Sequence, residues 1–216
     1  SSGNYIVNVR DAEGCIISEA ITLTEPAPID ATFSARTSTL ACFGDQDASI
    51  TVTNVTGGQG FNYTYTLNTI LPTPSTSGPQ TSNVFDNLGS GTYSVTITDG
   101  FECSTTSLDI VINEPTEVEA SLVASTTQTC LTSASLTLSA AGGTGPYSYS
   151  DDSNFTNILG TFSTSTTFDV APGVYSYFVR DSNNCVTNVS NEITIEDIPN
   201  LVINLENINP TINCAG

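Results

Sequence analysis

The chain has 216 residues, and 22 acidic against three basic side chains give it a formal net charge of −19 at pH 7. A chain this acidic repels nucleic-acid phosphates and anionic lipid surfaces, which argues against nucleic-acid partners and direct membrane insertion. Histidine is absent and the basic residues are Arg10, Arg36 and Arg180, so the Ser-His, Cys-His and Ser-Lys pairs of nucleophilic catalysis cannot form within this chain. We therefore do not expect an enzyme.

One sequence motif, which we call the repeated phrase, occurs three times in the chain. It reads GNYIVNVRDAEGC over residues 3–15, GTYSVTITDGFEC over 91–103 and GVYSYFVRDSNNC over 173–185, at intervals of 88 and 82 residues. Other landmarks share this period, namely Cys42, Cys130 and Cys214, Gly57-Gly58 and Gly142-Gly143, and Glu25-Pro26 and Glu114-Pro115. Such a period indicates tandem modules. We predict the C-terminal part of a preceding repeat in residues 1–28, complete repeats in 29–117 and 118–200, and the start of a following repeat in 201–216.

Alternating apolar and polar residues predict β-strands in each module. In chain order they are SITVTNV at 49–55, FNYTYTL at 61–67, GTYSVTIT at 91–98, TSLDIVI at 106–112, ASLTLSA at 134–140 and PYSYS at 146–150. Within 91–98, Tyr93, Val95 and Ile97 should share one face. The Ser/Thr/Pro-rich residues 71–82 indicate an exposed loop. Short strands and frequent turn signals predict an all-β chain of tandem immunoglobulin-like β-sandwich modules joined end to end.

A tyrosine near the start of each repeated phrase resembles the tyrosine corner of immunoglobulin-like folds, in which the hydroxyl bonds to upstream backbone. The candidates are Tyr5, Tyr93 and Tyr175. The cysteine that antibody domains carry two residues later is replaced by Val95 and Tyr177, and the chain has no tryptophan. A tyrosine that only fills the core is the alternative.

Six cysteines without histidine predict disulfides in an oxidising compartment, and a zinc site is disfavoured because no C-x-x-C pair is present. Two pairing schemes respect the repeat. The preferred one joins Cys15 with Cys42, Cys103 with Cys130 and Cys185 with Cys214, as long hairpins centred on the Glu-Pro turns would do. The other joins Cys42 with Cys103 and Cys130 with Cys185. It must link a residue before strand B to the F–G turn, and these usually lie at opposite ends of a sandwich.

Acidic side chains raise the question of calcium. Asp45 and Asp47 are the leading candidates, and other turns and linkers carry Asp11, Glu13, Asp99, Glu102, Asp181, Glu114, Glu117, Glu119, Glu196 and Asp197. No segment matches an EF-hand loop or a complete nonapeptide calcium repeat. The pair Asp151-Asp152 is poorly suited to glycoside hydrolysis, because neighbouring strand residues point to opposite faces. We expect solvated turns and no cofactor, with calcium as the open alternative.

With these residues in view, the chain resembles the SprB repeat of Bacteroidetes cell-surface adhesins, a family associated with gliding motility. The matching motifs are CFGDQDASITV from Cys42, GG followed by PYSY from Gly142, LGSGTYSVTITD before Cys103, and the closing INEP. The second complete module departs from the pattern at Leu131-Thr132-Ser133. The resemblance implies a giant filamentous protein that is exported by the type IX system, attached to the outer membrane and moved by the motility machinery.

Two functions fit the sequence. The first is a structural and adhesive repeat that grips a surface polysaccharide or solid surface, with the outer-membrane gliding and secretion machinery contacted through other parts of the chain. The alternative is a set of carbohydrate-binding accessory modules of a secreted polysaccharide-degrading protein. Exposed coplanar rings would favour sugar binding and burial of alternate rings would favour a scaffold; the rings concerned are Phe61, Tyr63, Tyr65, Tyr147 and Tyr149.

Overall fold

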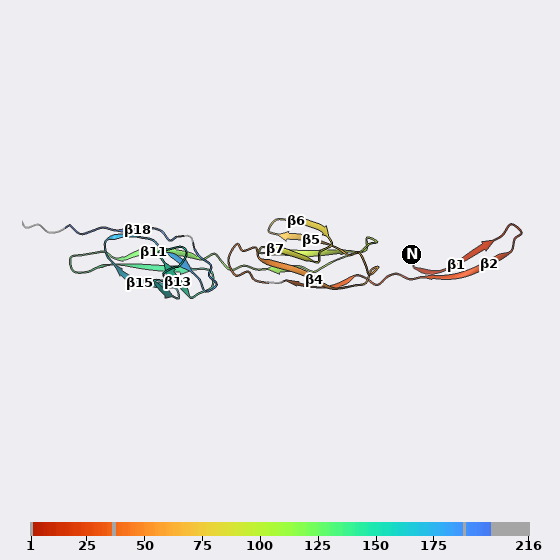
Figure 1. Cartoon of the computed structure of the whole chain (residues 1–216), viewed down its shortest axis with the longest axis horizontal. Coiled ribbons are helices and arrows are strands. Elements are labelled where there is room, and N and C mark those ends of the chain that lie inside the picture. Colours follow the sequence, from red (N-terminus) through yellow and green to blue (C-terminus); the bar gives the residue numbers. More distant parts are fainter. Residues whose placement is uncertain (1, 36–37, 188, 200–216) are drawn as a thin grey trace, which may run out of the picture. The chain divides into compact units, whose positions relative to one another are not determined.

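The computed structural model describes residues 2–35, 38–187 and 189–199. The chain divides into two compact units, Ser1–Thr116 and Glu117–Gly216. This division lies one residue from the predicted boundary between the two complete modules. Every regular element within the described ranges is a β-strand (Figure 1). The predicted start of a following repeat, residues 201–216, lies outside the described residues.

The chain begins with an isolated hairpin. Strands β1 (Gly3–Arg10) and β2 (Ile16–Leu23) pair only with each other among the described strands. All residues of both strands are exposed. Tyr5 and Val7 are 41% and 46% exposed, whereas Tyr93 and Val95 at the same places in the next repeat are 6% and 0% exposed. The hairpin therefore has the sequence pattern of a half-buried element without an opposing sheet.

The rest of the first unit is a sandwich of two antiparallel sheets. One has the order β3-β4-β7, made of β3 (Asp30–Ala35), β4 (Ala48–Thr56) and β7 (Val84–Leu88). The other has the order β10-β8-β5-β6 with β9 also on β8, made of β5 (Thr64–Leu71), β6 (Ser75–Gln80), β8 (Gly91–Thr98), β9 (Ser104–Thr106) and β10 (Ile110–Ile112). These strands correspond to A, B and E facing C′, C, F and G of an immunoglobulin-like domain. The predicted fold class is confirmed.

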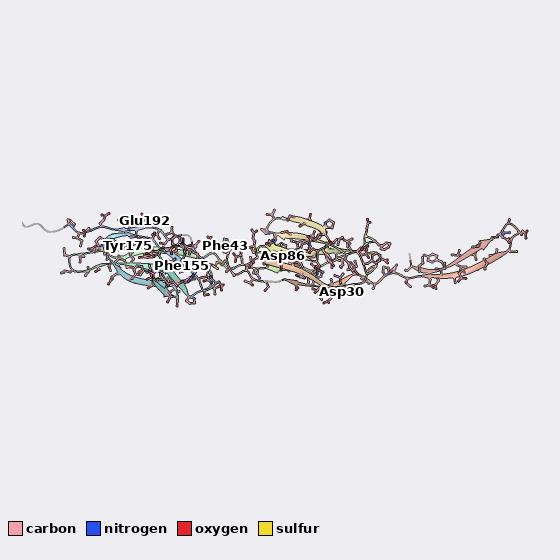
Figure 2. The ribbon with its side chains drawn as sticks, in the orientation of Figure 1. Asp30, Phe43, Asp86, Phe155, Tyr175 and Glu192 are labelled. Atoms are coloured by element: carbon pink, nitrogen blue, oxygen red, sulfur yellow. The ribbon has the colours of Figure 1, made fainter. Side chains whose placement is uncertain are left out.

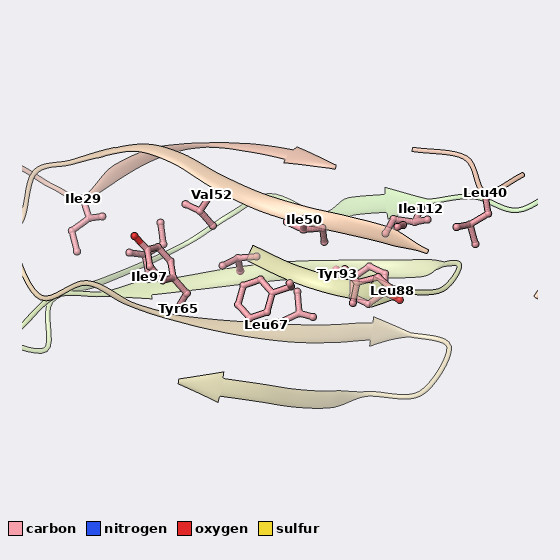
Figure 3. Close-up of a cluster of buried hydrophobic side chains, with 13 residues drawn as sticks. Ile29, Leu40, Ile50, Val52, Tyr65, Leu67, Leu88, Tyr93, Ile97 and Ile112 are labelled. Carbon is pink, nitrogen blue, oxygen red and sulfur yellow. The ribbon is translucent and has the colours of Figure 1, made fainter. Parts of the chain in front are cut away.

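Alternation along the strands fills the core between the sheets. Tyr93, Val95 and Ile97 of β8 are 6%, 0% and 0% exposed, as their spacing predicts. Ile50 of β4 and Leu67 of β5 enter the same cluster from the two sheets (Figure 3). Each fully buried aliphatic side chain contributes about 1.5–3 kcal/mol relative to exposure. This burial fixes which face of each strand is turned inward.

The second unit repeats the sandwich with shorter strands. One sheet has the order β11-β12-β15, made of β11 (Glu119–Thr126), β12 (Ala134–Ala141) and β15 (Ser165–Val170). The remaining strands form β14-β13-β17 and β16-β18, made of β13 (Tyr147–Ser150), β14 (Gly160–Phe162), β16 (Gly173–Tyr175), β17 (Phe178–Arg180) and β18 (Ile193–Ile195). Tyr149 of β13 stacks on Phe168 of β15 with ring centroids 5.6 Å apart. An aromatic core thus joins the sheets.

Strands β16 and β17 occupy the place of the single strand β8. Between them, the Oγ of Ser190 accepts the backbone N–H of Tyr177 at 3.0 Å. The first unit has the same feature, where the Oγ of Ser107 accepts the N–H of Val95 at 2.9 Å. A serine side chain therefore replaces a carbonyl of strand G in both modules. In the second module the ladder is interrupted there.

Two strand predictions need correction. Residues 71–82 are not a loop throughout, because β6 pairs with β5. Their Ser, Thr and Pro content suits an exposed edge strand, whose outer backbone groups bond to water. The segment 106–112 is not one strand either. Strand β9 ends at Thr106, β10 begins at Ile110, and Leu108 between them is 91% exposed.

Candidate functional site

The turn that closes each repeated phrase is built by an aspartate. We call this segment the Asp-Cys turn; it comprises residues 11–15, 99–103 and 181–185. The Oδ1 of Asp99 accepts the backbone N–H groups of Phe101 and Cys103, both at 2.9 Å. Asp11 and Asp181 accept bonds from the residues two and four positions later in the same way. The carboxylate therefore sets the turn that presents the cysteine.

The second oxygen of the same aspartate ties this turn to the Gly-Gly segment. The Oδ2 of Asp99 accepts the N–H of Gln59 at 2.8 Å, and the Oδ2 of Asp181 accepts that of Thr144 at 2.8 Å. Gly58 has φ +53°, and a Cβ there would lie 2.6 Å from Asp99 Oδ2. Glycine is needed because the backbone must approach the carboxylate closely in a left-handed conformation. The repeated aspartate and the repeated glycines therefore act together to hold the Asp-Cys turn against the Gly-Gly segment.

The ionisation of Asp99 reflects this role. The side chain is 5% exposed, and burial opposes its charge. The backbone N–H groups of Gln59, Phe101 and Cys103, together with the Cys103 thiol, outweigh burial and lower the pKa of Asp99 below its ordinary value. A carboxylate held ionised by four donors is occupied by its own turn.

At the other end of the first sandwich, two acids hold the turn that carries Cys42. The Oδ2 of Asp45 accepts the N–H of Cys42 at 2.9 Å. The Oε2 of Glu114 accepts the N–H of Gly44 at 2.8 Å, and this bond lowers the pKa of Glu114. Glu114 thus links the segment where the chain leaves the sandwich to the segment before strand B. The sequence showed no signal for this pairing.

The calcium candidates Asp45 and Asp47 have different surroundings. Asp45 is partly buried and bonded within its turn, and Asp47 is exposed. In the part of the chain that the structure describes, there is no group of three or more His, Cys, Asp or Glu side chains able to hold a metal ion. Calcium binding at these residues stays a prediction.

Two of the tyrosine-corner candidates, Tyr93 and Tyr175, donate their hydroxyls to the backbone four residues upstream. Tyr93 donates to the carbonyl of Gly89 at 3.0 Å, and Tyr175 donates to that of Ala171 at 2.8 Å. Both bonds span four residues, which is the geometry of a tyrosine corner. Tyr175 is among the side chains labelled in Figure 2. Tyr5, the third candidate, lies on the exposed hairpin.

Two of the three preferred cysteine pairs are not formed. Cys42 and Cys185 are disulfide-bonded, whereas Cys15, Cys103 and Cys130 have free thiols and are exposed. Neither Cys15–Cys42 nor Cys103–Cys130 is therefore formed, and the alternative scheme fails because both of its bonds need Cys103 or Cys130. The third preferred pair includes Cys214, which lies outside the described residues.

The physical reason lies in the strand pairing around the Glu-Pro turns. The preferred scheme assumes a long hairpin on either side of each turn. Instead, β2 pairs with β1 and β3 pairs with β4 around the first turn. Around the second, β10 pairs with β8 and β11 pairs with β12. The residues that flank a Glu-Pro pair thus belong to different sheets.

The aromatic rings do not make a flat platform. Tyr65, Tyr147 and Tyr149 are 8%, 7% and 9% exposed. Tyr63 is partly buried and donates its hydroxyl to the carbonyl of Gly57 at 2.6 Å. Phe61 is 49% exposed, but its partner is Phe101, with the planes 83° apart. Burial of alternate rings is the outcome predicted for a scaffold.

One turn of the second unit is built around a hydrogen-bonded carboxylate that the sequence pattern does not predict. Asp152 accepts the hydroxyl of Thr156 and the N–H groups of Asn154 and Thr156, which lowers the pKa of Asp152 to about 2. The turn holds Phe155, labelled in Figure 2, at φ 52°. The Arg180 guanidinium lies over its ring, 4.6 Å from the ring centroid. The sequence indicates Asp152 only as a member of the Asp151-Asp152 pair, which is poorly suited to glycoside hydrolysis.

A comparison with known families gives one matching family model. Residues 35–71 match the family model described as the SprB repeat. The first complete module therefore contains a match to the SprB repeat. The matched SprB repeat runs from the end of β3 through the Cys42 turn, β4 and the Gly-Gly pair to the end of β5. The resemblance of the second module to the SprB repeat stays a prediction.

The SprB repeat and the disulfide-bonded cysteines indicate a cell-surface adhesin-type repeat segment of an extracellular or surface protein. No curated protein matches the sequence significantly. Within the described ranges, no helix is long and apolar enough to cross a bilayer.

Solved structures with similar folds include three N-terminal domains of the bacteriophage RB49 highly immunogenic outer capsid protein (Hoc). Identity is 17% over 78% of this chain, which spans 59% of the Hoc fragment, with a TM-score of 0.34. A C-terminal fragment of intimin, solved with the intimin-binding domain of its receptor Tir, has 16% identity over 79% of this chain and 65% of its own length, with a TM-score of 0.39. Murine CEACAM1b has 15% identity over 78% of this chain and 100% of its own length, with a TM-score of 0.32.

Proposed function

We propose that this SprB-repeat chain is a structural and adhesive segment of a giant filamentous cell-surface adhesin, resembling those used in gliding motility. One observation carries the proposal: the polar side chains that recur in both modules form hydrogen bonds within their own module. Asp99 and Asp181 build turns and bind the Gly-Gly segments. Tyr93 and Tyr175 bond to upstream carbonyls. Recurring residues that stabilise their own module are expected in a repeating structural framework.

The proposal extends to the setting of the protein. We place it outside the cell, attached to the outer membrane through other parts of the chain and exported by the type IX system. Its partners are a surface polysaccharide or a solid surface, together with the gliding and secretion machinery. The net charge of −19 supports the exclusion of nucleic acid and of direct insertion into anionic membranes. Neither catalysis nor a cofactor is part of the proposal, and calcium stays the open alternative.

The carbohydrate-binding alternative is less well supported. A sugar platform needs exposed rings, and Tyr65, Tyr147 and Tyr149 lie in the cores. The exposed pair Phe61 and Phe101 meets edge to face. A framework with adhesive loops accounts for these positions without a dedicated sugar site.

Adhesion under flow tests the proposal. Beads carrying the 216-residue chain through a C-terminal tag are driven over bare glass and over polysaccharide-coated glass. Control beads carry an unrelated immunoglobulin-like domain of similar net charge. We expect more retained beads than with the control, and retention that soluble oligosaccharides do not abolish. Retention equal to the control on every surface would refute adhesion. Saturable calorimetric binding of one oligosaccharide, with full competition, would establish the alternative.

A further inference from the structure

Each sandwich carries its two cysteines at opposite ends. In the first unit, the Asp-Cys turn with Cys103 contacts the Gly-Gly segment, where Gly58 donates its N–H to Ala27 just before the chain enters the sandwich. Cys42 lies where the chain leaves, because Gly44 binds Glu114. We call these the N-terminal and C-terminal ends of the sandwich.

The distance between the two ends rules out a bond within one module. The eight-residue strand β8 separates them, a span of about 26 Å at 3.3 Å per residue. A disulfide needs Cα atoms within about 7 Å. Cys103 therefore cannot reach Cys42 in a folded first unit.

The second unit has the same arrangement. Asp181 of its Asp-Cys turn binds Thr144, and a Cβ at Gly143 would overlap the side chain of Val118, the residue before β11. Cys185 thus lies at the N-terminal end. Cys130 follows the far end of the eight-residue β11 and so lies at the C-terminal end.

Identical positions differ in their redox state. Cys103 and Cys185 follow the same aspartate in the same turn, with N–H bonds to Oδ1 of 2.9 Å in both. Cys185 is disulfide-bonded and Cys103 has a free, exposed thiol. At the C-terminal ends, Cys42 is bonded and Cys130 is free and exposed. At the N-terminal ends and at the C-terminal ends alike, one of the two cysteines is thus disulfide-bonded.

Exposed apolar side chains lie close in sequence to the free thiols of Cys103 and Cys130. Phe101 lies two residues before Cys103, is 62% exposed and packs against the 49% exposed Phe61. Leu131 directly follows Cys130 and is 95% exposed. Large exposed apolar residues beside a free, exposed thiol are suited to contact with another protein surface. Their positions at the two ends of a sandwich specify which surface would cover them.

We propose that Cys103 and Cys130 are linkage sites to further modules of the same kind. Cys130 forms a disulfide with the Asp-Cys-turn cysteine of one such module, and Cys103 forms one with the C-terminal-end cysteine of another. In each bond two thiols lose two protons and two electrons to a disulfide oxidant such as oxidised glutathione, which is reduced to two thiols. The linkage is independent of what the protein adheres to.

Two matched variants test the pairing rule. Both carry Cys15→Ser and Cys214→Ser. One also carries Cys130→Ser and keeps the thiol of Cys103, and the other carries Cys103→Ser and keeps the thiol of Cys130. The two proteins differ in tag mass and are mixed in equal amounts in a glutathione redox buffer. Non-reducing electrophoresis and peptide mass spectrometry then give the shares of the three possible dimers.

The proposal expects heterodimers to exceed homodimers at least tenfold. Random thiol collisions would give heterodimers for only half of the dimers, and that result, or an absence of dimers, overturns the proposal. A further change, Phe101→Ser in the variant that keeps Cys103, should return the ratio toward random while the thiol stays available. Circular dichroism melting of each variant checks that the sandwiches remain folded.

Discussion

Replacing Gly57 with alanine should destabilise the first sandwich far more than the same change at Gly60. The two glycines lie in one turn with φ +83° and +78°, a left-handed conformation that costs an alanine about 1–2 kcal/mol. A Cβ at Gly60 would have no atom within 4 Å, whereas one at Gly57 would lie closer than 3.0 Å to the carbonyl oxygen of Pro28. That oxygen belongs to the backbone and cannot rotate away.

The size of the effect follows from what must move. Separating the turn from Pro28 breaks the bond from the N–H of Gly58 to Ala27 at 2.7 Å and strains the bond from Tyr63 to Gly57 at 2.6 Å. Each hydrogen bond contributes about 0.5–1.5 kcal/mol, and overpacking adds about 1–3 kcal/mol. We expect Gly57→Ala to lower the free energy of unfolding by about 3–6 kcal/mol and Gly60→Ala to lower it by about 1–2 kcal/mol.

Urea titration followed by hydrogen-exchange mass spectrometry separates the two units. Peptides from β5 and β8 report on the first sandwich, and peptides from β12 serve as an internal reference that neither substitution should change. If both variants lose the same stability, the close approach to Pro28 does not govern this turn, and the reasoning from glycine geometry is refuted.

Three further predictions concern single substitutions. Leu136→Ala, at a side chain that is 0% exposed, should cost about 2–5 kcal/mol in urea unfolding, whereas Leu131→Ala, at one that is 95% exposed, should change stability by less than about 0.5 kcal/mol. Tyr93→Phe removes the bond to Gly89 and should cost about 1 kcal/mol in the same assay; no loss would mean that the corner bond is neutral. The pKa of Asp152 is about 2 in the folded chain against an ordinary 3.8, so its contribution to stability is present above pH 3.8 and is lost as the pH falls through about 2. The stability difference between the native chain and Asp152→Asn should therefore shrink over that range, and a carboxyl titration by NMR with a midpoint near 3.8 would contradict the assignment.

Alternation in the sequence predicted the strands that face the core because one face of each sheet is buried. Val95 and Ile97 are 0% exposed, as are Leu136 and Leu138 in the second unit. A shift of one residue would turn such a set toward solvent, so the pattern leaves a single register. The same reasoning holds for Tyr93, whose place after a Gly-rich turn also predicts its hydroxyl bond.

Hydrogen bonds between side chains and backbone groups that are far apart in the sequence are not predicted by any alternation of residues. The amide of Asn191 accepts the N–H of Leu122 at 2.8 Å and donates to its carbonyl at 2.7 Å. These partners are 69 residues apart, and any of the chain's many polar residues could have made the contact. The link from Glu114 to Gly44 is similar. Specificity here comes from the assembled fold, which local sequence does not encode.

The cysteine pairing failed for a related reason. Sequence spacing gives loop lengths, but a disulfide depends on which end of a sandwich each cysteine occupies. That end depends on strand order: β10 returns along β8, and β11 begins a new sheet with β12. Similar loop lengths across the Glu-Pro turns therefore carried no information about distance.

The repeated phrase also indicates where adhesive differences should lie. In the first complete module its glycine lies against the tyrosine ring, its tyrosine bonds to upstream backbone, its alternate residues fill the core and its aspartate builds the turn. None of these positions can change without cost to the fold. The segment after strand C is different: the first unit has the exposed six-residue β6, and the second has the Asp152 turn and the three-residue β14. Replacing the exposed Thr73, Ser75 and Ser77 of the first unit with alanine should therefore alter bead retention under flow while leaving the core protected from hydrogen exchange. Unchanged retention would move the adhesive surface to another part of the module.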